Sequence, residues 1–480
     1  MMRLLSDNQP LWLEWAQQSS HQAAFITPTH TYNWQQVSDL VELYATYLRE
    51  RGLSSGDVLT IVGKNQPETV PVYLAAITLG VVCSFTMPQP VSKLEEKLET
   101  LYRSEEQAYL WLPDSNVADT VVFSRPNVSI LSIPTLEEVS ITELAPIANS
   151  TLTRAFYINA LATIVFTSGS TGTPKAVAHT LRQHLSSADG LLEVFHFNQG
   201  DTWLLSLPMY HVSGLAILHR WLFAGGCLKI GSGNLDIDIQ GCSHASLVAT
   251  QLHRLLENHR ALDLTHVLLG GSHIPAELTQ QAQALGVETW LGYGMTEAAS
   301  TVTAMHAGLD FDKETAGHLL KHRQLKIENE RIFIGGETLA AGYYHQGELK
   351  PLADAKGWFD SKDIGAWSGE QLRIIGRADN QFISGGENIH CEEIERALNN
   401  ISEVKQAFVI PVEDVEFGFR PVAIVECDEL ASKVWFDSRL DGVLERYKYP
   451  IEYHQLPDLE LQGIKISRVG LAAWLKQERS

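Results

Sequence analysis

One stretch decides how this chain is interpreted: Thr167-Ser168-Gly169-Ser170-Thr171-Gly172-Thr173-Pro174-Lys175. Its nine residues comprise five hydroxyls, two glycines, one proline and one lysine, and no acid. Residues 162–166, just before it, form an apolar and partly β-branched run that is typical of a buried strand. Glycines let the backbone approach an anion, hydroxyls donate hydrogen bonds and Lys175 adds a positive charge. The stretch therefore predicts a polyphosphate-binding loop after a buried strand.

Two widespread phosphate-binding motifs do not fit this stretch. The P-loop of GTPases and kinases needs a Gly-Lys-Ser/Thr sequence at a spacing that is missing here. Gly169 and Gly172 do not satisfy the G-x-G-x-x-G pattern of dinucleotide-binding folds. A solvated Ser/Thr/Gly turn is the plain alternative for such a loop taken alone. The interpretation therefore depends on whether the rest of the chain supplies matching parts.

A second segment, Leu291-Gly292-Tyr293-Gly294-Met295-Thr296-Glu297, adds nucleotide and metal chemistry. The glycines on both sides of Tyr293 let the chain pass close to a flat ligand such as adenine. Thr296 can donate a hydrogen bond to a phosphate, and Glu297 is a hard oxygen ligand suited to Mg²⁺. The two segments together resemble the phosphate loop and the Y-G-x-T-E motif of the acyl-adenylating superfamily, which includes acyl-CoA synthetases, peptide-synthetase adenylation domains and luciferases.

The resemblance covers nearly the whole chain, and further motifs follow in the family's order. It implies that Asp363 accepts hydrogen bonds from both ribose hydroxyls, that Arg377 lies near the ribose, and that Asp379 is a pivot between two domains. It also implies that Lys465 is the catalytic lysine, and that the turn Gly385-Gly386 lines the channel for the thiol of CoA. An isolated acid or lysine is usually a solvated surface charge. The assignment of these residues therefore depends on several motifs occurring together and in the family's order.

The site implied by the resemblance uses ATP and Mg²⁺, with CoA as co-substrate. Its catalytic residues are Thr296, Glu297 and Lys465, and Glu297 is the metal ligand. The expected nucleotide-binding residues are Thr167, Ser168, Gly169, Ser170, Thr171, Gly172, Lys175, Gly271, Ser272, Gly292, Tyr293, Thr296, Asp363, Arg377 and Lys465.

Apolar runs alternate with helix-like segments before Gly376, and the pattern changes after it. Strands are predicted at residues 58–62, 81–85, 204–207, 245–249 and 266–269, and a helix at 67–80. This alternation is typical of parallel sheets covered by helices. The last part predicts an amphipathic helix at 391–399, strands at 405–411 and 421–426, and a helix near 436–445. We expect an α/β fold with a large N-terminal adenylation domain of helix-covered sheets (1–376) and a small, mobile α+β lid domain (377–480).

The charge balance narrows the possible partners. The 480 residues, 45% of them hydrophobic, can build a large core divided into two to four lobes. With 57 acidic and 36 basic residues the net charge is −21, which disfavours binding of nucleic acid. ATP, CoA and a carboxylic acid substrate are also anions, so local cations must overcome the overall field. Lys175, Arg220, Arg377 and Lys465 are candidates for this task.

Cysteine usage and hydropathy predict a cytoplasmic protein. The five cysteines are widely spaced and lack a C-x-x-C pair, which favours reduced thiols over disulfides or zinc. The N-terminus has no long apolar region of the kind found in signal peptides. The longest apolar stretch, residues 72–87, is interrupted by Thr78 and Gly80 and is too short for a membrane span. The oligomeric state stays open.

Two stretches bear on the acid that is activated. Pro208-Met209-Tyr210-His211-Val212-Ser213-Gly214 resembles the family segment that floors the acyl pocket, and Arg220 follows on a predicted helix. The Arg220 guanidinium either faces a second negative group on the substrate or lies on the surface with its stem on Trp221. The expected substrate-binding residues are His211, Arg220, Gly294, Ser300 and Thr301.

The C-terminal motif Gly463-Ile464-Lys465-Ile466-Ser467-Arg468 departs from the usual Thr-Gly-Lys of the family. Together with residues 206–214, 244–248 and 292–302, it resembles the o-succinylbenzoate–CoA ligases of menaquinone synthesis, whose substrate carries two carboxylates. This implies activation of that acid as an acyl-adenylate and its transfer to CoA. The alternatives are another aryl- or acyl-CoA ligase, a free-standing adenylating enzyme that loads a carrier protein, and a catalytically idle nucleotide-binding protein. Loss of Thr296, Glu297 or Lys465 would favour the last, and all three are present.

Overall fold

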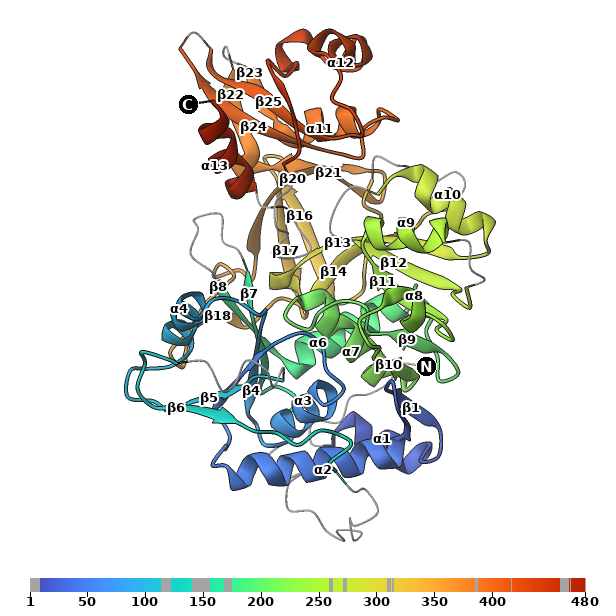
Figure 1. Cartoon of the computed structure of the whole chain (residues 1–480), viewed down its shortest axis with the longest axis vertical. Helices are drawn as coiled ribbons and strands as arrows, with labels where there is room; N and C mark the ends of the chain where they lie inside the picture. Colours follow the sequence, from blue (N-terminus) through green and yellow to red (C-terminus); the bar gives the residue numbers. More distant parts are fainter. Residues whose placement is uncertain are drawn as a thin grey trace.

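The chain folds into a main body built on two large sheets and a smaller C-terminal lobe (Figure 1). The computed structural model describes residues 9–113, 122–139, 156–167, 175–258, 262–270, 274–308, 312, 315–384, 387–415, 417–457, 466 and 468–479. Among these residues, no helix is long and apolar enough to cross a membrane.

The first sheet of the main body has eight strands in the order β19-β18-β8-β7-β4-β3-β5-β6 across the described chain. The strands β7, β4, β3, β5 and β6 are parallel, and β8, β18 and β19 continue the sheet antiparallel. Their bounds are β3 (Val58–Val62), β4 (Val82–Thr86), β5 (Ala108–Trp111), β6 (Val128–Leu131), β7 (Leu161–Thr167), β8 (Lys175–Thr180), β18 (Gly342–His345) and β19 (Glu348–Lys350).

The second sheet has thirteen described strands in the order β16-β17-β20-β21-β15-β14-β13-β12-β11-β9-β10-β1-β2. Its parallel part runs from β13 to β1, and the strands from β14 to β16 are antiparallel. The bounds are β1 (Ala23–Ile26), β2 (Thr31–Asn33), β9 (Thr202–Leu204), β10 (Cys227–Lys229), β11 (His244–Leu247), β12 (His266–Gly270), β13 (Glu288–Met295), β14 (Ser300–His306), β15 (His318–Leu319), β16 (Arg323–Glu328), β17 (Arg331–Gly336), β20 (Phe359–Ser368) and β21 (Gln371–Arg377).

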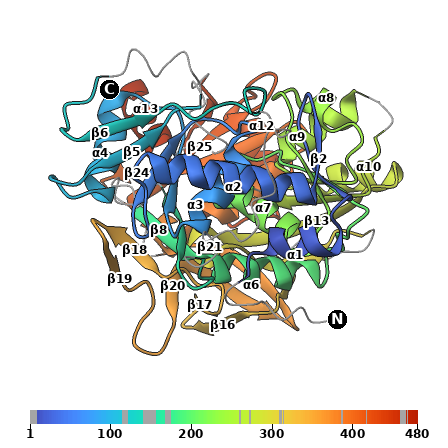
Figure 2. The ribbon, with the colours of Figure 1, turned by 90° about the horizontal axis from the view of Figure 1, so that it is seen from below.

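Helices cover these sheets, as the alternating pattern predicts. Their bounds are α1 (Leu11–Gln18), α2 (Trp34–Glu50), α3 (Thr69–Thr78), α4 (Val91–Leu101), α6 (Leu181–Leu192), α7 (Val212–Ala224), α8 (Leu235–Asp238), α9 (Ala249–Glu257) and α10 (Ala276–Ala284). Seen from below, α2 crosses the end of the molecule opposite the C-terminal lobe (Figure 2). Its Trp34 stacks on Trp221 of α7 with ring centroids 5.0 Å apart, and both side chains are fully buried. Large aromatic surfaces thus fix α7, the helix that carries Arg220, against the core.

The C-terminal lobe, residues 381–479, has its own sheet and its own buried clusters. Its elements are β22 (Gln381–Ser384), β23 (Glu387–His390), α11 (Cys391–Asn399), β24 (Gln406–Asp414), β25 (Gly418–Glu426), α12 (Lys433–Leu440), β26 (Tyr453–Gln455) and α13 (Arg468–Glu478). One apolar cluster packs α11 and α12 on the sheet, and a second packs α13 through Leu471 and Leu475. The predicted domain boundary between Gly376 and Arg377 falls at the end of β21 and stays a prediction.

Several predicted elements match the structure, and three do not keep their bounds; the strand predicted at 245–249 ends at Leu247, and Ala249 begins α9. The strand at 58–62 and the helix at 391–399 have the predicted bounds. The strand predicted at 204–207 is wrong, because β9 ends at Leu204. The Leu205 amide bonds the Lys229 carbonyl before the chain leaves the sheet. The helix predicted near 436–445 is also misplaced, since α12 ends at Leu440. Both sheets are mixed rather than wholly parallel, because strands after β13 and β7 pair antiparallel.

All five cysteines are free and buried. Burial raises the pKa of the Cys227 and Cys242 thiols to about 12 and shifts the other three in the same direction. Such thiols remain protonated and behave as small apolar side chains.

Three buried histidines form a column between β8, α6 and α7. His184 stacks on His219 with ring centroids 4.2 Å apart, and His179 lies 4.8 Å from His184. The Thr163 hydroxyl forms a hydrogen bond of 2.7 Å with Nε2 of His184, and the Tyr73 hydroxyl forms one of 2.8 Å with Nε2 of His219. Burial lowers the pKa of His179 to about 4 and that of His219 to about 3, and it lowers the pKa of His184 as well. All three rings are therefore neutral at physiological pH.

We expect this column to make the fold sensitive to acid. The folded pKa values lie below the ordinary 6.5, so the stabilisation is complete above pH 6.5 and is lost as the pH falls toward 4. In this window, each histidine that stays neutral in the folded protein lowers the free energy of unfolding by about 1.4 kcal/mol for every unit by which the pH falls. Urea unfolding between pH 7.5 and 4.5 measures the slope. In His179→Gln, the slope of the unfolding free energy against pH should decrease by the contribution of one histidine. The exposed control His253→Gln should leave this slope unchanged. Equal slopes for His179→Gln and the unmodified protein would contradict the assignment.

Candidate active site

The candidate site lies where strands of both large sheets end. Thr167, the last residue of β7, pairs with Lys175, the first residue of β8, so residues 168–174 connect two paired strand ends. The parallel strands β12 and β13 end at Gly270 and Met295, and carboxyl ends of parallel strands are a common place for ligand binding. The expected nucleotide-binding residues Ser168, Gly169, Ser170, Thr171, Gly172, Gly271 and Ser272 lie outside the described residues.

Glu297 and Lys175, predicted from separate motifs, lie on either side of Tyr343. The Tyr343 hydroxyl donates a hydrogen bond to Glu297 Oε1 at 3.3 Å. On its other side, the Lys175 ammonium lies 5.1 Å from the centroid of the Tyr343 ring, within the range of a cation–π contact. Burial and the Glu297 charge raise the pKa of Tyr343. The structure thus brings the expected phosphate-binding cation and the expected metal ligand to the same tyrosine.

Thr296 and Glu297 lie in a tight turn between β13 and β14. The turn is a 3₁₀ helix at Thr296–Ala298, and Ala299 and Ser300 after it have φ values of 50° and 91°. Positive φ at consecutive non-glycine residues costs free energy and is found where a site demands it. A Cβ on Gly294 would lie 1.8 Å from the Ser300 carbonyl oxygen. Gly294 is therefore required for the reversal of the chain, a reason the sequence alone did not reveal.

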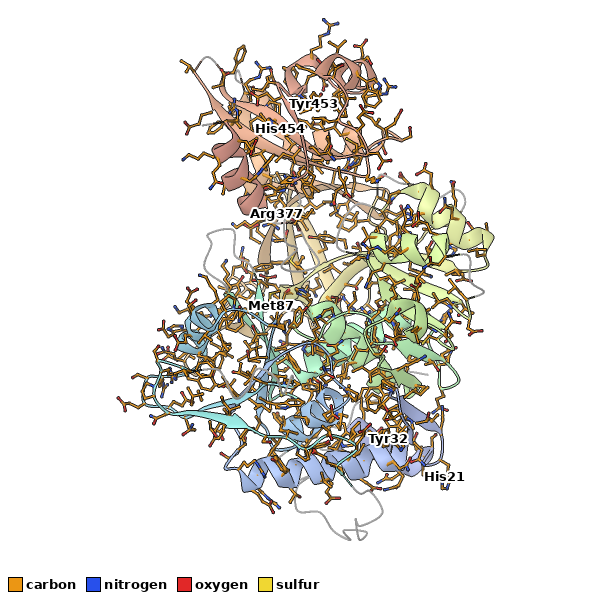
Figure 3. All side chains as sticks on the ribbon, viewed as in Figure 1. His21, Tyr32, Met87, Arg377, Tyr453 and His454 are labelled. Atoms are coloured by element: carbon orange, nitrogen blue, oxygen red, sulfur yellow. The ribbon has the colours of Figure 1, made fainter. Side chains whose placement is uncertain are left out.

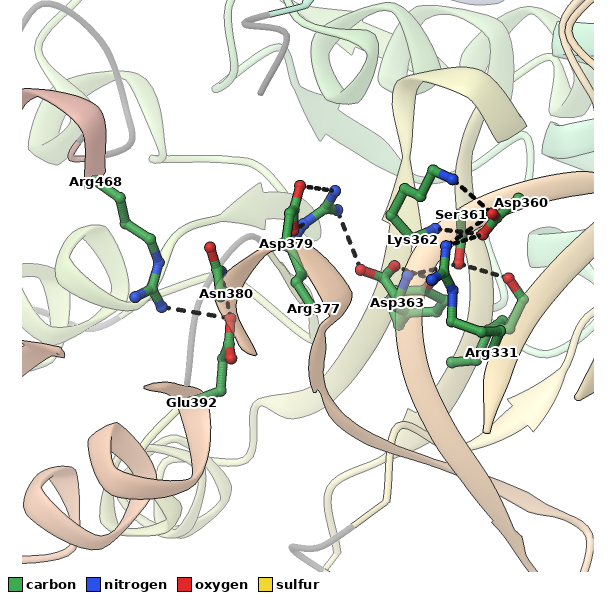
Figure 4. Close-up of polar contacts among 12 residues, drawn as sticks. Arg331, Asp360, Ser361, Lys362, Asp363, Arg377, Asp379, Asn380, Glu392 and Arg468 are labelled. Atoms are coloured by element: carbon green, nitrogen blue, oxygen red, sulfur yellow. Dashed lines mark hydrogen bonds and ion pairs between the residues drawn. The ribbon is translucent and has the colours of Figure 1, made fainter. Parts of the chain in front are cut away.

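Tyr293, Asp363 and Arg377 form a connected group at the junction with the C-terminal lobe. The Tyr293 hydroxyl donates to Asp363 Oδ2 at 2.5 Å, and Arg377 Nη1 donates to Asp363 Oδ1 at 3.1 Å. Arg377 also holds Asp379 through two hydrogen bonds of 2.8 and 3.1 Å (Figure 4). Figure 3 shows Arg377 where the lobe meets the main body. Three predicted nucleotide residues and the predicted pivot are thus in direct contact.

The charges of this group are balanced by their partners. Burial raises the pKa of Asp363, an effect that the Tyr293 hydrogen bond and the Arg377 charge reduce. Burial acts in the same sense on Asp379, but the hydrogen bonds and charge of Arg377 outweigh it and lower the pKa of Asp379. A carboxylate has about four lone-pair positions, so Asp363 keeps acceptor capacity for further donors such as ribose hydroxyls.

A second polar group continues from the junction toward the C-terminal motif. Asn380 donates to Glu392 Oε1 at 2.5 Å, and Arg468 lies 3.5 Å from the same carboxylate (Figure 4). Arg468 also donates to Glu395 at 2.5 Å and to the Val409 carbonyl at 3.0 Å. The chain is therefore anchored to the lobe three residues after Lys465, which itself lies outside the described residues. The expected CoA-contacting residues Gly385 and Gly386 also lie outside them.

Arg220 is buried and faces a predicted substrate residue. Only 2% of it is exposed, and its Nη2 donates to Thr301 Oγ1 at 3.2 Å. Its guanidinium lies 5.5 Å from the Trp203 ring centroid. The alternative in which Arg220 is a surface residue is therefore wrong. No acidic side chain of the described residues forms an ion pair with it.

A second buried arginine, Arg323, approaches the same threonine. Its Nε donates to the Thr301 carbonyl at 3.0 Å, and its Nη2 donates to the Ser187 hydroxyl at 2.8 Å. Burial and the charge of Arg323 lower the pKa of Arg220 to about 9. Burial lowers the pKa of Arg323 to about 9 as well, against the opposing charge of Asp189. Both guanidiniums remain charged near neutral pH, so the region around Thr301 is positively charged and suited to an anion.

Of the remaining expected substrate residues, Ser300 adjoins this region, whereas His211 lies at the start of α7. His211 is the N-cap residue of α7, the helix on which Arg220 lies two and a half turns further along. Ser300 precedes Thr301 on β14, with their hydroxyl oxygens 3.5 Å apart. Gly292, an expected nucleotide-binding residue, lies against β14, where an added Cβ would meet the Thr301 methyl at 3.0 Å.

Sequence reasoning missed Tyr343 and Arg323. Both contact residues that lie far away in the sequence, Glu297 and Thr301, so no local spacing indicated them. Tyr343 lies in the segment Gly342-Tyr343-Tyr344, which reads as an ordinary edge strand. Arg323 opens β16, where an arginine between polar residues suggests an exposed position. No local sequence signal therefore indicated either residue.

The side chains present fit ATP and one magnesium ion. The described residues contain no cluster of three or more histidine, cysteine or acidic side chains arranged to hold a metal. Mg²⁺ in nucleotide sites is usually held by one or two carboxylates together with phosphate oxygens and water, a pattern that Glu297 can serve. Lys175 supplies a cation beside it, and Asp363 supplies a buried acceptor at the junction.

Comparison with known proteins gives consistent matches. Residues 12–344 match the AMP-binding enzyme family. The chain is 37% identical over 471 residues to the 2-succinylbenzoate–CoA ligase of Salmonella typhimurium, which covers 97% of both chains. It is 36% identical to the enzyme of the same name from Escherichia coli K12, with 98% of both chains covered.

Solved structures agree with these matches. An arginine-to-lysine variant of E. coli MenE with bound OSB-AMS has a TM-score of 0.85 and 35% sequence identity, covering 99% of this chain and 100% of that one. The o-succinylbenzoate coenzyme A synthetase of Bacillus subtilis, in complex with ATP and magnesium ion, has a TM-score of 0.78. It is 24% identical, with 93% of this chain and 96% of that chain covered, and therefore shows a shared fold.

Proposed function

Because this chain belongs to the AMP-binding enzyme family, we propose that it is an ATP-dependent ligase that joins 2-succinylbenzoate to CoA through an acyl-adenylate. Identity of 36–37% to two 2-succinylbenzoate–CoA ligases over nearly the full length supports this function. The observation that carries the choice of substrate is the buried Arg220, which has no acidic partner among the described residues and faces Thr301. A second carboxylate on the substrate would supply the missing anion.

The reaction has two steps. A carboxylate oxygen of the acid attacks the α-phosphorus of ATP, which forms the acyl-adenylate and releases pyrophosphate. The thiol of CoA, losing its proton, then attacks the activated carbonyl, and AMP leaves with the bonding electron pair. The first step is needed because a free carboxylate has no good leaving group, whereas AMP is one.

The chain's own residues would serve both steps by position and charge. Lys175 would hold the β- and γ-phosphates, and Thr296 would donate to the α-phosphate as negative charge gathers there. Glu297 would hold Mg²⁺, whose charge neutralises the polyphosphate. Asp363 and Arg377 would hold the ribose, and Lys465 would approach the α-phosphate during adenylation only. Arg220 and Thr301, together with the expected substrate residues His211 and Ser300, would hold the substrate's non-reacting carboxylate.

We further propose a division at Gly376–Arg377 and rotation of the C-terminal lobe about Asp379 between the two steps. The two separate apolar clusters of the lobe support such a movement. Rotation would withdraw Lys465 and bring the Gly385-Gly386 turn to the thiol channel. We place the enzyme in the cytoplasm, in keeping with its five free, buried thiols.

The function is tested by comparing acids in two assays. Pyrophosphate exchange into ATP reports adenylation, and thioester formation with CoA reports the whole reaction. We expect both with 2-succinylbenzoate and neither at comparable efficiency with benzoate or fatty acids. Equal activity with the other acids would favour a broader acyl-CoA ligase. Exchange without any thioester would favour an enzyme that loads a carrier protein, and ATP binding without exchange would favour an idle nucleotide-binding protein.

The proposed metal role of Glu297 predicts an effect of charge removal. Glu297→Gln keeps the shape of the side chain but loses the charge that holds Mg²⁺. Loss of groups that merely orient a metal ligand costs about 10–100-fold in metal affinity, so loss of the ligand charge should raise the Mg²⁺ concentration for half-maximal exchange by at least about 10-fold. Glu337→Gln, an exposed carboxylate of the same body, is the control. Unchanged Mg²⁺ dependence in Glu297→Gln would assign the metal to another carboxylate.

A further inference from the structure

Tyr343 occupies a position that neither motif of the nucleotide site includes. It lies on β18, which pairs antiparallel with β8 so that Tyr343 is opposite Val177. Lys175 is two residues before Val177 and is therefore the diagonal neighbour of Tyr343 on the same face of the pair. Diagonal neighbours are within reach of aromatic and long side chains, and the 5.1 Å distance from the ammonium to the ring centroid agrees with this.

The main chain around Tyr343 also joins the two large sheets. The Ala340 amide donates to the Glu297 carbonyl at 2.8 Å, and the Ala341 amide donates to the Ala178 carbonyl at 2.9 Å. One short segment is thus bonded to the turn after β13 in the thirteen-stranded sheet and to β8 in the eight-stranded sheet. Its backbone is fixed on both sides just before Tyr343. The tyrosine side chain therefore projects from a well-anchored segment between Lys175 and Glu297.

The two ends of the side chain offer different chemistry. The phenol hydroxyl, protonated at neutral pH, donates to Glu297 Oε1 at 3.3 Å and so orients this carboxylate. The ring face attracts the Lys175 ammonium, for which no acidic partner is found in the described part of the chain. A carboxylate in this place would pair with Lys175 and compete with phosphate. An aromatic ring holds the cation and leaves its charge available.

We infer that Tyr343 is a positioning residue that sets the spacing between the cation for the β- and γ-phosphates and the carboxylate for Mg²⁺. The inference rests on the proposed roles of Lys175 and Glu297. The hydroxyl directs Glu297 toward the metal, and the ring directs Lys175 toward the phosphates, so each function can be removed separately. Tyr343 does not touch the reacting atoms.

The test separates these two functions by substitution. Tyr343→Phe keeps the ring and removes the hydroxyl, whereas Tyr343→Leu removes both. Tyr344→Phe is the matched control, because Tyr344 is the next residue of β18 and packs in the apolar cluster on the other face of the sheet. Mn²⁺ replaces Mg²⁺, and its binding at saturating ATP is followed by electron paramagnetic resonance. ATP binding at saturating Mn²⁺ is measured by calorimetry. Neither measurement requires an acid substrate.

We expect Tyr343→Phe to weaken Mn²⁺ binding about 10-fold, the lower end of the effect of losing a group that orients a metal ligand. Its affinity for ATP at saturating metal should stay unchanged. Tyr343→Leu should show the same loss of Mn²⁺ affinity and, in addition, about two- to fivefold weaker ATP binding from loss of the cation–π contact. Tyr344→Phe should match the unmodified protein in both measurements.

A double substitution makes the test stricter. If the hydroxyl acts through Glu297, then Glu297→Gln with Tyr343→Phe should bind Mn²⁺ no more weakly than Glu297→Gln alone. Additive losses would overturn the inference, as would unchanged Mn²⁺ and ATP binding in folded Tyr343→Phe and Tyr343→Leu. If Glu297→Gln alone had no effect on Mn²⁺ binding, the proposed metal role would fail and the inference with it. If instead the binding pattern held but 2-succinylbenzoate gave no thioester, only the proposed substrate would fail.

Discussion

Lys465→Ala is expected to slow adenylation of 2-succinylbenzoate by about 10²–10³-fold, the typical effect of removing one group that stabilises developing negative charge. Thioester formation from a supplied acyl-adenylate should be nearly unchanged. The reason is that the lysine charge is needed only while the carboxylate oxygen approaches the α-phosphorus and pyrophosphate leaves. Pyrophosphate exchange measures the first step, and release of AMP from the supplied adenylate in the presence of CoA measures the second.

We expect this substitution to leave the lobe folded. The chain is fixed just after the lysine, where Arg468 bonds Glu395 at 2.5 Å and the Val409 carbonyl at 3.0 Å. Lys476→Ala, on the exposed side of α13, is the matched control and should retain both half-reactions. Equal loss in both half-reactions, with an unchanged thermal midpoint, would show that Lys465 serves the thioester step as well. Equal loss with a lowered midpoint would indicate misfolding and contradict the proposed role.

Arg220→Ala is expected to weaken binding of 2-succinylbenzoate by about 2–4 kcal/mol, the usual cost of leaving one partner of a buried charge pair alone. Arg220 is buried, and among the described residues its guanidinium donates one side-chain hydrogen bond, to Thr301, which leaves donors for a substrate carboxylate. The KM for ATP should hardly move, because the nucleotide is held by other residues. Arg220→Lys should restore only part of the affinity, because an ammonium cannot reproduce the planar fork of a guanidinium.

A substrate analogue distinguishes recognition from folding. An analogue of 2-succinylbenzoate without the non-reacting carboxylate should bind the unmodified enzyme and Arg220→Ala about equally, as measured by calorimetry. Because Arg220 lies against Trp203 in the core, the thermal midpoint of each variant must be recorded alongside. An unchanged KM for 2-succinylbenzoate in folded Arg220→Ala would transfer recognition of the second carboxylate to His211 or Ser300.

Local sequence patterns correctly predicted the helices and strands in which buried residues recur with a regular spacing. The strand at 58–62 is buried at every position and apolar except at Thr60, and the helix at 391–399 buries Cys391, Ile394 and Leu398 on one face. The helix near 436–445 was misplaced because apolar residues after Leu440 belong to a turn. The antiparallel half of the thirteen-stranded sheet was missed, and two of its pairings, β15 with β21 and β17 with β20, join segments far apart in the sequence that no local period records.

The site was predictable as separate motifs and not as an arrangement. Sequence motifs indicated Tyr293, Asp363 and Arg377 individually, but their contacts join residues up to 70 positions apart, as the hydrogen bond from Tyr293 to Asp363 shows. The burial of Arg220 likewise depends on packing against Trp203 and Thr301 from two other elements. Motifs report which residue types are present, whereas packing decides whether a charge is buried or solvated.

The buried thiols have a practical consequence for observing the proposed rotation. Maleimide reagents modify accessible thiolates, and all five native cysteines are buried with raised pKa values. The native chain is therefore a low-background host for site-specific fluorescent labelling. Cysteines introduced at Val434 on α12 and Ile237 on α8, which are 78% and 59% exposed, would be the reactive pair. Energy transfer between dyes at these two positions could then follow the C-terminal lobe through a catalytic cycle without prior removal of native cysteines.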